Sequence, residues 1–181
     1  MRIQVCGYSG SGKSTLSKKL GQIYNVKVLH IDTIHFEPNW VIRDNNLMEE
    51  DIKKFLEEND SWVIDGNYYR HNKERFDLAD KIIYLKFNRW TCFFRTLFRS
   101  IRNKGVQRDD MAEGCLDKPS FSFSMWVLFG VRKKKITKRF FDIVKNYKEK
   151  VVILKNRKEL DNYLKGIIND KEKNWWIKRN H

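Results

Sequence analysis

The stretch near the N-terminus constrains this chain more than any other. Residues 3–6 are short and apolar, as expected of a buried strand in a parallel sheet. They are followed by GYSGSGKS, residues 7–14, which fits the pattern G-x-x-x-x-G-K-[ST] of a phosphate-binding loop. Leu16, Leu20 and Ile23 then recur at helical spacing. The loop is therefore predicted to lie between a strand and a helix.

Each residue type in this loop has a physical task. Glycines let the backbone turn tightly and bring its N–H groups against a polyphosphate, and the following helix directs its positive end at the same oxygens. Lys13 supplies a mobile cation, and the Ser14 hydroxyl is placed to ligate Mg²⁺. We therefore expect ATP and Mg²⁺ as ligands. The loop residues expected to contact them are Gly7, Ser9, Gly10, Ser11, Gly12, Lys13, Ser14 and Thr15.

The length of 181 residues suits one domain with a sizeable core, and we expect residues 1–181 to form a single P-loop kinase-like domain. No run of about 18 apolar residues occurs, so neither a transmembrane helix nor a membrane partner is expected. No signal peptide is recognisable before the first predicted strand. Three cysteines without metal-type spacing are expected to be reduced thiols of a cytoplasmic protein.

The formal net charge of +14 is unevenly distributed. Residues 1–80 hold 11 Lys and Arg against 13 Asp and Glu, whereas residues 81–181 hold 26 against 10. Such a field favours polyanions, including nucleotides and nucleic acids. The alternative is that many of the lysines simply solvate the outer faces of helices.

Short apolar runs alternate with amphipathic helical patterns, which predicts an α/β fold with a parallel sheet. The expected strands are 3–6, 26–31, 62–64, 81–87 and 151–154. The expected helices are 13–24, 45–59, 68–78, 89–103, 121–147 and 157–169. A bend near Gly130 is expected in the fifth helix.

Two of the predicted strands end in an aspartate. Because ligands of open parallel sheets bind outside the carboxyl ends of the strands, Asp32 and Asp65 are both expected beside the phosphate loop. Asp32 is predicted to orient an acceptor hydroxyl or a Mg²⁺ water, although capping of a turn is the alternative. Asp65 is predicted to hold Mg²⁺ from the second shell and to border the acceptor.

The residues that follow these aspartates are candidates for contacts with the acceptor. His35 follows Asp32 in the same loop, with Phe36, Pro38 and Trp40. This aromatic group either walls an acceptor pocket or packs the loop onto the next helix; packing is expected of Trp40, and the role of His35 is left open. A lone histidine is weak evidence for a functional site. The candidates from the third strand end are Gly66, Asn67, Tyr68 and Arg70.

The predicted helix 89–103 carries arginines on one side and apolar residues on the other. Arg95, Arg99 and Arg102 lie at i, i+4 and i+7, with no acidic residue among them. Guanidinium groups match phosphate geometry and stabilise a phosphoryl group during transfer. Arg95 and Arg99 are therefore predicted to be catalytic; a solvated basic face is the alternative.

Residues 103–120 are polar and contain glycines, which is typical of a lid or binding loop. Arg108 is predicted to act as a lid cation, unless it pairs with a neighbouring aspartate. After the last strand, the Asn156 backbone or the Arg157 side chain is expected to contact the nucleotide base. The basic and aromatic tail, residues 170–181, is expected to dock on the domain or on a partner.

Several separated motifs resemble those of the bacterial DNA topology modulation proteins over about residues 1–155. The motifs are GYSGSGKS at 7–14, LHIDTIHF at 29–36, WVIDGNY at 62–68, FNRWTC at 87–92 and DMAEGC at 110–115. That family is similar to adenylate-kinase-type P-loop kinases. The resemblance implies a five-stranded parallel sheet with the nucleoside monophosphate kinase strand order, ATP–Mg²⁺ binding and a short helical lid with arginines.

The resemblance leaves the acceptor open. Asp65-Gly66 matches the Asp-Gly that follows the third strand of adenylate kinases, but the proline-bearing continuation found there is absent. The family name implies a role in DNA supercoiling, which these motifs do not show. We therefore predict an ATP-dependent kinase with a small-molecule acceptor, such as a nucleoside or nucleotide. The alternatives are an ATP-dependent DNA-binding regulator and a non-catalytic nucleotide sensor.

Overall fold

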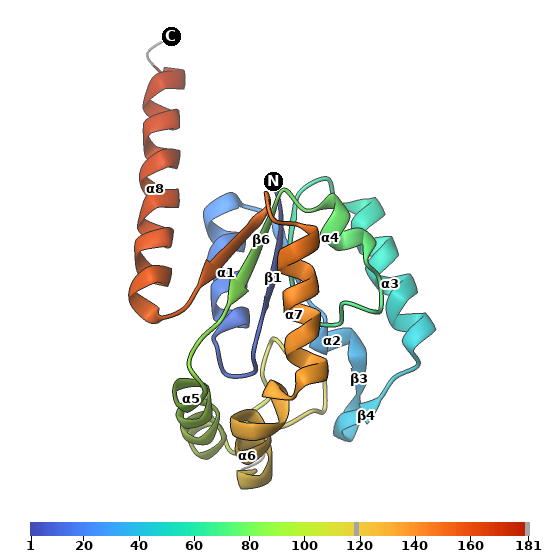
Figure 1. The fold of residues 1–181 in the computed structure, drawn as a ribbon. Helices are drawn as coiled ribbons and strands as arrows, with labels where there is room; N and C mark the ends of the chain where they lie inside the picture. Colours follow the sequence, from blue (N-terminus) through green and yellow to red (C-terminus); the bar gives the residue numbers. More distant parts are fainter. Residues whose placement is uncertain (118–119, 180–181) are drawn as a thin grey trace.

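The structure is a computed structural model that describes residues 1–117 and 120–179; the side chains of residues 174–179, including the Trp175-Trp176 pair of the predicted docking tail, lie outside this description. Figure 1 shows a central sheet with helices on both faces. Five parallel strands form the sheet in the order β2-β5-β1-β6-β7. Their bounds are β1 Arg2–Gly7, β2 Lys27–His30, β5 Trp62–Asp65, β6 Lys81–Leu85 and β7 Val151–Leu154.

The other elements surround this sheet. The helices are α1 Lys13–Tyr24, α2 Asp32–His35, α3 Asn45–Glu58, α4 Glu74–Leu78, α5 Arg89–Arg102, α6 Phe121–Phe129, α7 Lys134–Asn146 and α8 Arg157–Arg179. Two 3₁₀ turns, η1 Pro38–Trp40 and η2 Gly130–Arg132, and a small antiparallel hairpin of β3 Phe36–Glu37 and β4 Val41–Ile42 complete it. The lid region predicted at 103–120 connects α5 to α6. The expectation of a helical lid is wrong for its described residues, which form turns and irregular segments.

All five predicted strands are confirmed, and the predicted helices differ from the structure in three places. The helix expected at 68–78 is reduced to α4, because Asn72 has a positive φ of 88° and its side chain caps the backbone N–H of Arg75. The helix expected at 121–147 is divided into α6, η2 and α7, with an extended Lys133 between the last two. The last helix continues well beyond its predicted end.

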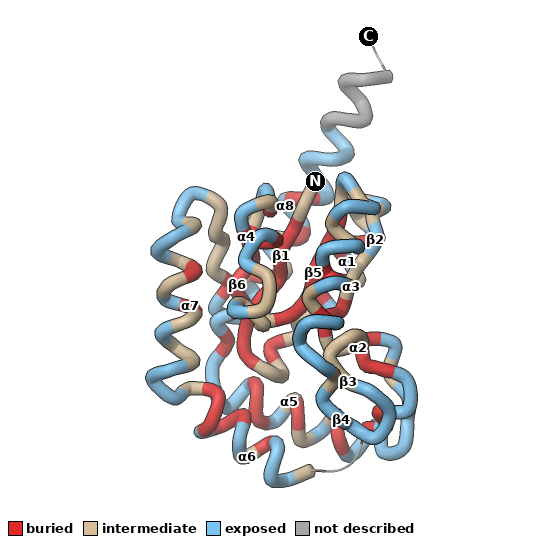
Figure 2. Tube along the Cα trace, turned by 90° about the vertical axis from the view of Figure 1, so that its right-hand side faces the viewer, coloured by how far each residue is buried: buried red, intermediate tan, exposed pale blue. Residues whose placement is uncertain are grey.

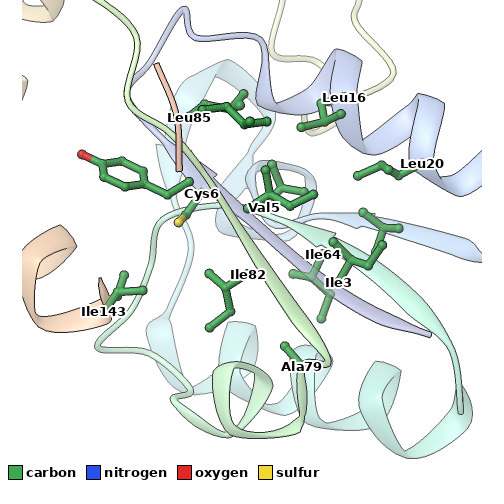
Figure 3. Close-up of a cluster of buried hydrophobic side chains, with 14 of the residues drawn as sticks. Ile3, Val5, Cys6, Leu16, Leu20, Ile64, Ala79, Ile82, Leu85 and Ile143 are labelled. Atoms are coloured by element: carbon green, nitrogen blue, oxygen red, sulfur yellow. The ribbon is translucent and has the colours of Figure 1, made fainter. Parts of the chain in front are cut away.

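The core forms where the faces of the sheet meet α1 and α7. Ile3 and Val5 of β1 pack with Leu16 and Leu20 of α1 on one face, and Cys6 points to the other face, toward α7 (Figure 3). Figure 2 shows that buried positions follow β1, β5 and β6. Since apolar side chains cover both faces, the strands read as continuous apolar runs in the sequence.

Two expectations from the sequence, on the cysteines and on membrane-spanning helices, are compared here with the described residues. The three thiols there are all buried and none belongs to a disulfide. No helix in the described part of the chain has both the length and the hydropathy that crossing a bilayer requires.

Candidate active site

The phosphate loop follows β1 and is shaped by its glycines. Gly10 and Gly12 adopt φ values of 78° and 94°, which side chains with a Cβ rarely adopt. The loop closes through a hydrogen bond from the Ser11 N–H to the Tyr8 carbonyl at 3.1 Å. Lys13 begins α1 and donates from Nζ to the same carbonyl at 3.4 Å. The first turn of α1 therefore faces the interior of the loop, as a polyphosphate site requires.

Helix α5 packs directly on this loop. A Cβ added to Gly10 would lie 2.5 Å from the Cys92 carbonyl oxygen and 2.8 Å from the Thr96 methyl carbon. Arg95, one turn along, donates from Nη1 to the Ser11 carbonyl at 3.3 Å, and its guanidinium lies over the Phe87 ring at 5.2 Å. The contact brings Arg95 to the edge of the nucleotide site.

The other two arginines predicted to act on phosphate are held by lid carboxylates. Arg108 donates from Nε to Asp110 at 3.0 Å and from Nη1 to Asp117 at 3.5 Å. Arg99 lies 3.8 Å from the Asp117 carboxylate. Burial opposes the charge of Arg108, but Asp110 and Asp117 outweigh it and raise its pKa. Burial and the nearby Arg108 lower the pKa of Arg99.

Asp110 connects the lid to the phosphate loop. Burial would raise the pKa of Asp110, but hydrogen bonding from the Ser14 hydroxyl and the charge of Arg108 hold it below its ordinary value. The neighbouring Asp109 forms an ion pair with Lys18 of α1 at 2.9 Å. The lid therefore presents an ionised carboxylate to the hydroxyl that was predicted to ligate Mg²⁺.

Asp32 begins α2 and faces the same cavity. Its carboxylate accepts a hydrogen bond of 2.7 Å from the Tyr68 hydroxyl. Burial raises the pKa of Asp32, although Tyr68 and the charge of Lys13 lower it in part. The Asp32 side chain, which was predicted from its strand-end position, therefore lies on the cavity with a hydroxyl that orients it.

The Asp65 carboxylate pairs with His30 and does not line the cavity. One of its oxygens lies 3.0 Å from Nδ1 of His30, both side chains are buried, and Asp65 is absent from the lining of the cavity that holds Asp32 and Ser14. Its other oxygen is buried and has no hydrogen-bond partner among the described residues. Asp110, which lines the cavity together with Ser14, was considered from the sequence only as a partner of Arg108.

The remaining acceptor candidates occupy different places. Asn67 pairs with the backbone of Gly7, accepting from its N–H at 3.0 Å and donating to its carbonyl at 2.9 Å. Gly66 leaves no room for a Cβ, which would approach Ile31 to 2.9 Å. Arg70 is exposed and outside the cavity lining. These positions give Asn67 and Gly66 a role in shaping the loop.

His35 also lies outside the lining, packed at 4.5 Å from the ring of Tyr68 and at 4.7 Å from that of Phe36. Burial lowers the pKa of His35. Trp40 packs on the Phe36 ring at 5.5 Å, as expected, and also lines the cavity with Phe36 and Tyr68.

Of the two candidate residues after β7, Arg157 lines the cavity and Asn156 does not. The Asn156 side chain caps α8 by accepting from the Glu159 N–H at 2.9 Å. Arg157 lines the cavity with Leu160 and Leu164 and pairs with Asp161 at 3.0 Å. This side of the cavity offers an apolar wall and one guanidinium, which suits a nucleotide base.

Two segments distant in sequence meet at one side of the cavity, which has a volume of about 1150 Å³. The Asn39 N–H donates to the Gly114 carbonyl at 3.2 Å, and Trp40 Nε1 donates to the Leu116 carbonyl at 3.1 Å. The Cys115 thiol donates to the Glu37 carbonyl at 3.2 Å. The β3–β4 hairpin and the lid are thus joined, and we call these three contacts the clamp.

The sequence analysis missed Asp110 and Asp117 as site residues. Both are buried and line the cavity, although they belong to a polar loop in which acidic residues are usually solvated. One signal was present: Arg108 and Asp110 lie two residues apart in a loop with glycines, which favours a folded turn over an open lid. No cluster of three or more His, Cys, Asp and Glu suited to a metal occurs in the described residues.

Comparisons with known proteins give the fold. No family model matches this chain, and no curated protein matches it. Among solved structures, the chain is similar to shikimate kinase from Bacteroides thetaiotaomicron, with a TM-score of 0.51 and 18% identity over 95% of this chain and 98% of that one. The chain therefore has a P-loop NTPase fold of the kinase type. No family model supports the resemblance to the DNA topology modulation proteins, and it stays a prediction.

Proposed function

We propose that this protein is an ATP-dependent phosphotransferase that transfers the γ-phosphoryl group to a hydroxyl of a small acceptor. The observation that carries the proposal is one cavity shared by the phosphate loop, Arg95 and the hydrogen-bonded pair of Asp32 and Tyr68. The kinase-type fold supports it, as does the similarity to the structure of a shikimate kinase.

The nucleotide side would act through positioning and charge. Backbone N–H groups of the loop and the start of α1 bind the phosphates, and Lys13 leaves the Tyr8 carbonyl to meet the outer ones. Arg95 is already directed at the loop and needs only a small movement to reach a phosphoryl group. Arg99 and Arg108 join it by exchanging lid carboxylates for phosphate oxygens.

The residues also fit Mg²⁺, which prefers oxygen ligands and usually keeps several waters. Ser14 would ligate the ion directly, and the ionised Asp110 beside it supplies a carboxylate for its water shell. Asp65, the carboxylate first predicted for this task, is occupied by His30. When bound, Mg²⁺ neutralises charge on the outer phosphates.

On the acceptor side, Asp32 would accept the proton of the attacking hydroxyl or orient it. Tyr68 holds one carboxylate oxygen of Asp32, which leaves the other free to meet the acceptor. Phe36 and Trp40 exclude water around that oxygen, which limits hydrolysis of ATP.

The direct experiment is a screen of hydroxyl compounds, including nucleosides and nucleotides, for uptake of phosphate from γ-labelled ATP. Lys13→Ala should lower the rate of transfer by roughly 100-fold or more while leaving the melting temperature unchanged. Lys53→Ala, on the exposed surface of α3, is the matched control. Transfer at the normal rate by the Lys13 variant would contradict the proposal.

Arg95→Ala separates catalysis from binding. Because Arg95 contacts the loop from its edge, we expect turnover to fall by about 1000-fold and ATP affinity to change far less. Equal losses in turnover and ATP affinity would assign Arg95 to ground-state binding alone.

A further inference from the structure

Helix α5 is turned so that its apolar side faces solvent. Trp90, Phe94, Phe98 and Ile101 are 54%, 47%, 65% and 60% exposed, and we call these four side chains the aromatic face of α5. The side of α5 that faces the phosphate loop and the cavity carries Arg95, Thr96 and Arg99 instead. A surface helix normally buries its apolar stripe and exposes its polar one, so this orientation is the reverse of the usual one.

The aromatic face is ordered and continuous. The Phe94 ring stacks with the Trp90 ring, with centroids 6.4 Å apart, and with the Phe98 ring, with centroids 6.2 Å apart. Helix α6 packs against α5, and both helices lie at the end of the molecule opposite the N-terminus (Figures 1 and 2). Phe121 and Phe129 of α6 are also exposed. Exposed apolar patches rimmed by polar residues on a monomer often mark an interaction surface.

The charged residues of α5 are all arginines, whereas the lid that follows it carries Asp109, Asp110, Glu113 and Asp117. Residues 81–108 and 118–141 contain no Asp or Glu. Arg89, Arg102 and Lys104 are exposed beside or just beyond α5, and none of the three forms an ion pair within the described part of the chain. The surface therefore combines aromatic rings with unpaired positive charge.

We propose that the aromatic face of α5 docks on an anionic lipid bilayer. A helix with Trp and Phe on one side and cations at its margins fits the membrane interface, where rings enter the headgroup region and cations meet acidic lipids. A second copy of this chain would bring equal positive charges together. Duplex DNA is held mainly through hydrogen bonds to its phosphates, whereas the centre of this surface is mainly hydrocarbon and aromatic ring.

The docking would be peripheral, since the chain is attached by one side of one helix. Its effect would reach the candidate active site, because the lid begins where α5 ends and α6 begins where the lid ends. The end of the lid that follows α5 would then be anchored at the bilayer. The proposal does not depend on the phosphotransferase activity and its test has a separate readout.

The test is flotation of the full chain with vesicles at physiological salt. We expect binding to vesicles of phosphatidylcholine with phosphatidylserine and not to phosphatidylcholine alone. Phe94→Ser with Phe98→Ser should lower the affinity by about tenfold or more, and Arg102→Glu and Lys104→Glu by roughly fivefold each. Leu47→Ser, an exposed leucine on α3, is the matched control and should bind as the parent does.

These substitutions are at exposed positions, so unchanged melting temperatures will show that the variants fold. The proposal fails if the parent chain does not bind the anionic vesicles, or if the Phe94 and Phe98 variant binds them equally well. It also fails if those two substitutions instead disperse a dimer in analytical ultracentrifugation, or abolish binding to a DNA fragment while vesicle binding is absent.

Discussion

At the scale of single residues, Arg75 is the costliest side chain to bury. It is fully buried in α4, and none of its three guanidinium nitrogens has a hydrogen-bond partner among the described residues. Its guanidinium packs on the Phe76 ring at 4.9 Å. Burial lowers the pKa of Arg75 to about 9, against weaker opposing effects of Cys6, Tyr68 and Asp65. Since arginine keeps its charge in proteins, the penalty falls on the stability of the fold.

We therefore expect Arg75→Met to raise the free energy of unfolding by about 1–3 kcal/mol, because methionine fills similar space without a charge to desolvate. Chemical denaturation of the parent and the variant measures this difference. Arg70→Met, at an exposed arginine, serves as the control and should leave stability unchanged. A destabilised Arg75→Met variant would show that bound water or a partner satisfies the guanidinium.

A second prediction at this scale concerns pH. Burial raises the pKa of Asp32, so the folded state holds that proton more tightly than the unfolded one. Its contribution to stability is present at low pH and is lost as pH rises through the raised pKa. The ionised form needed for transfer appears over the same range, which predicts an acid limb in the pH profile of kcat/KM.

Tyr68→Phe removes the hydroxyl that lowers the pKa of Asp32, and the acid limb should therefore move to higher pH. The pH profiles of the two enzymes measure the shift. Tyr69→Phe, at the neighbouring tyrosine outside the cavity, is the control. An unmoved acid limb in the Tyr68 variant would assign that limb to another group.

At the scale of elements, the contact between α5 and the phosphate loop holds the site together. Gly10→Ala should destabilise the protein by about 3 kcal/mol or more and weaken ATP binding, because the new Cβ would enter the Cys92 carbonyl. Gly105→Ala has a similar positive φ of 74° but no neighbour within 4 Å, and should cost only about 1–2 kcal/mol. Thermal unfolding with and without ATP measures the stability of both variants. Equal losses of stability would mean that α5 moves away from the added methyl group.

The elements also show what sequence reasoning can reach. The five strands were predictable because both faces of the sheet are covered, which leaves runs such as Val151–Leu154 without polar interruptions. The phosphate loop followed from its own pattern. The β3–β4 hairpin has two residues per strand, too few for a periodic signal, and was missed. The roles of Asp110 and Asp117 depend on partners distant in sequence, and no local pattern records such contacts.

At the scale of the whole molecule, the uneven charge defines a further prediction. The positive half, residues 81–181, should retain the chain on a DNA column at low salt through phosphate contacts alone. We expect this retention to disappear by physiological salt, since non-specific contacts release counterions and weaken steeply. Elution at increasing salt measures it. Retention at physiological salt together with DNA-stimulated ATP hydrolysis would favour the DNA-binding regulator over the kinase.

The clamp has a consequence for how the protein would work in time. Asn39 and Trp40 are hydrogen-bonded to backbone carbonyls of the lid, so an acceptor that passed between the hairpin and the lid would have to break those bonds. In the proposed enzyme, the nucleotide base would instead lie against a wall built from α8. We expect the separation of these two loops to be the rate-limiting step of turnover. The breaking of the phosphoanhydride bond would then be faster than the opening of the loops.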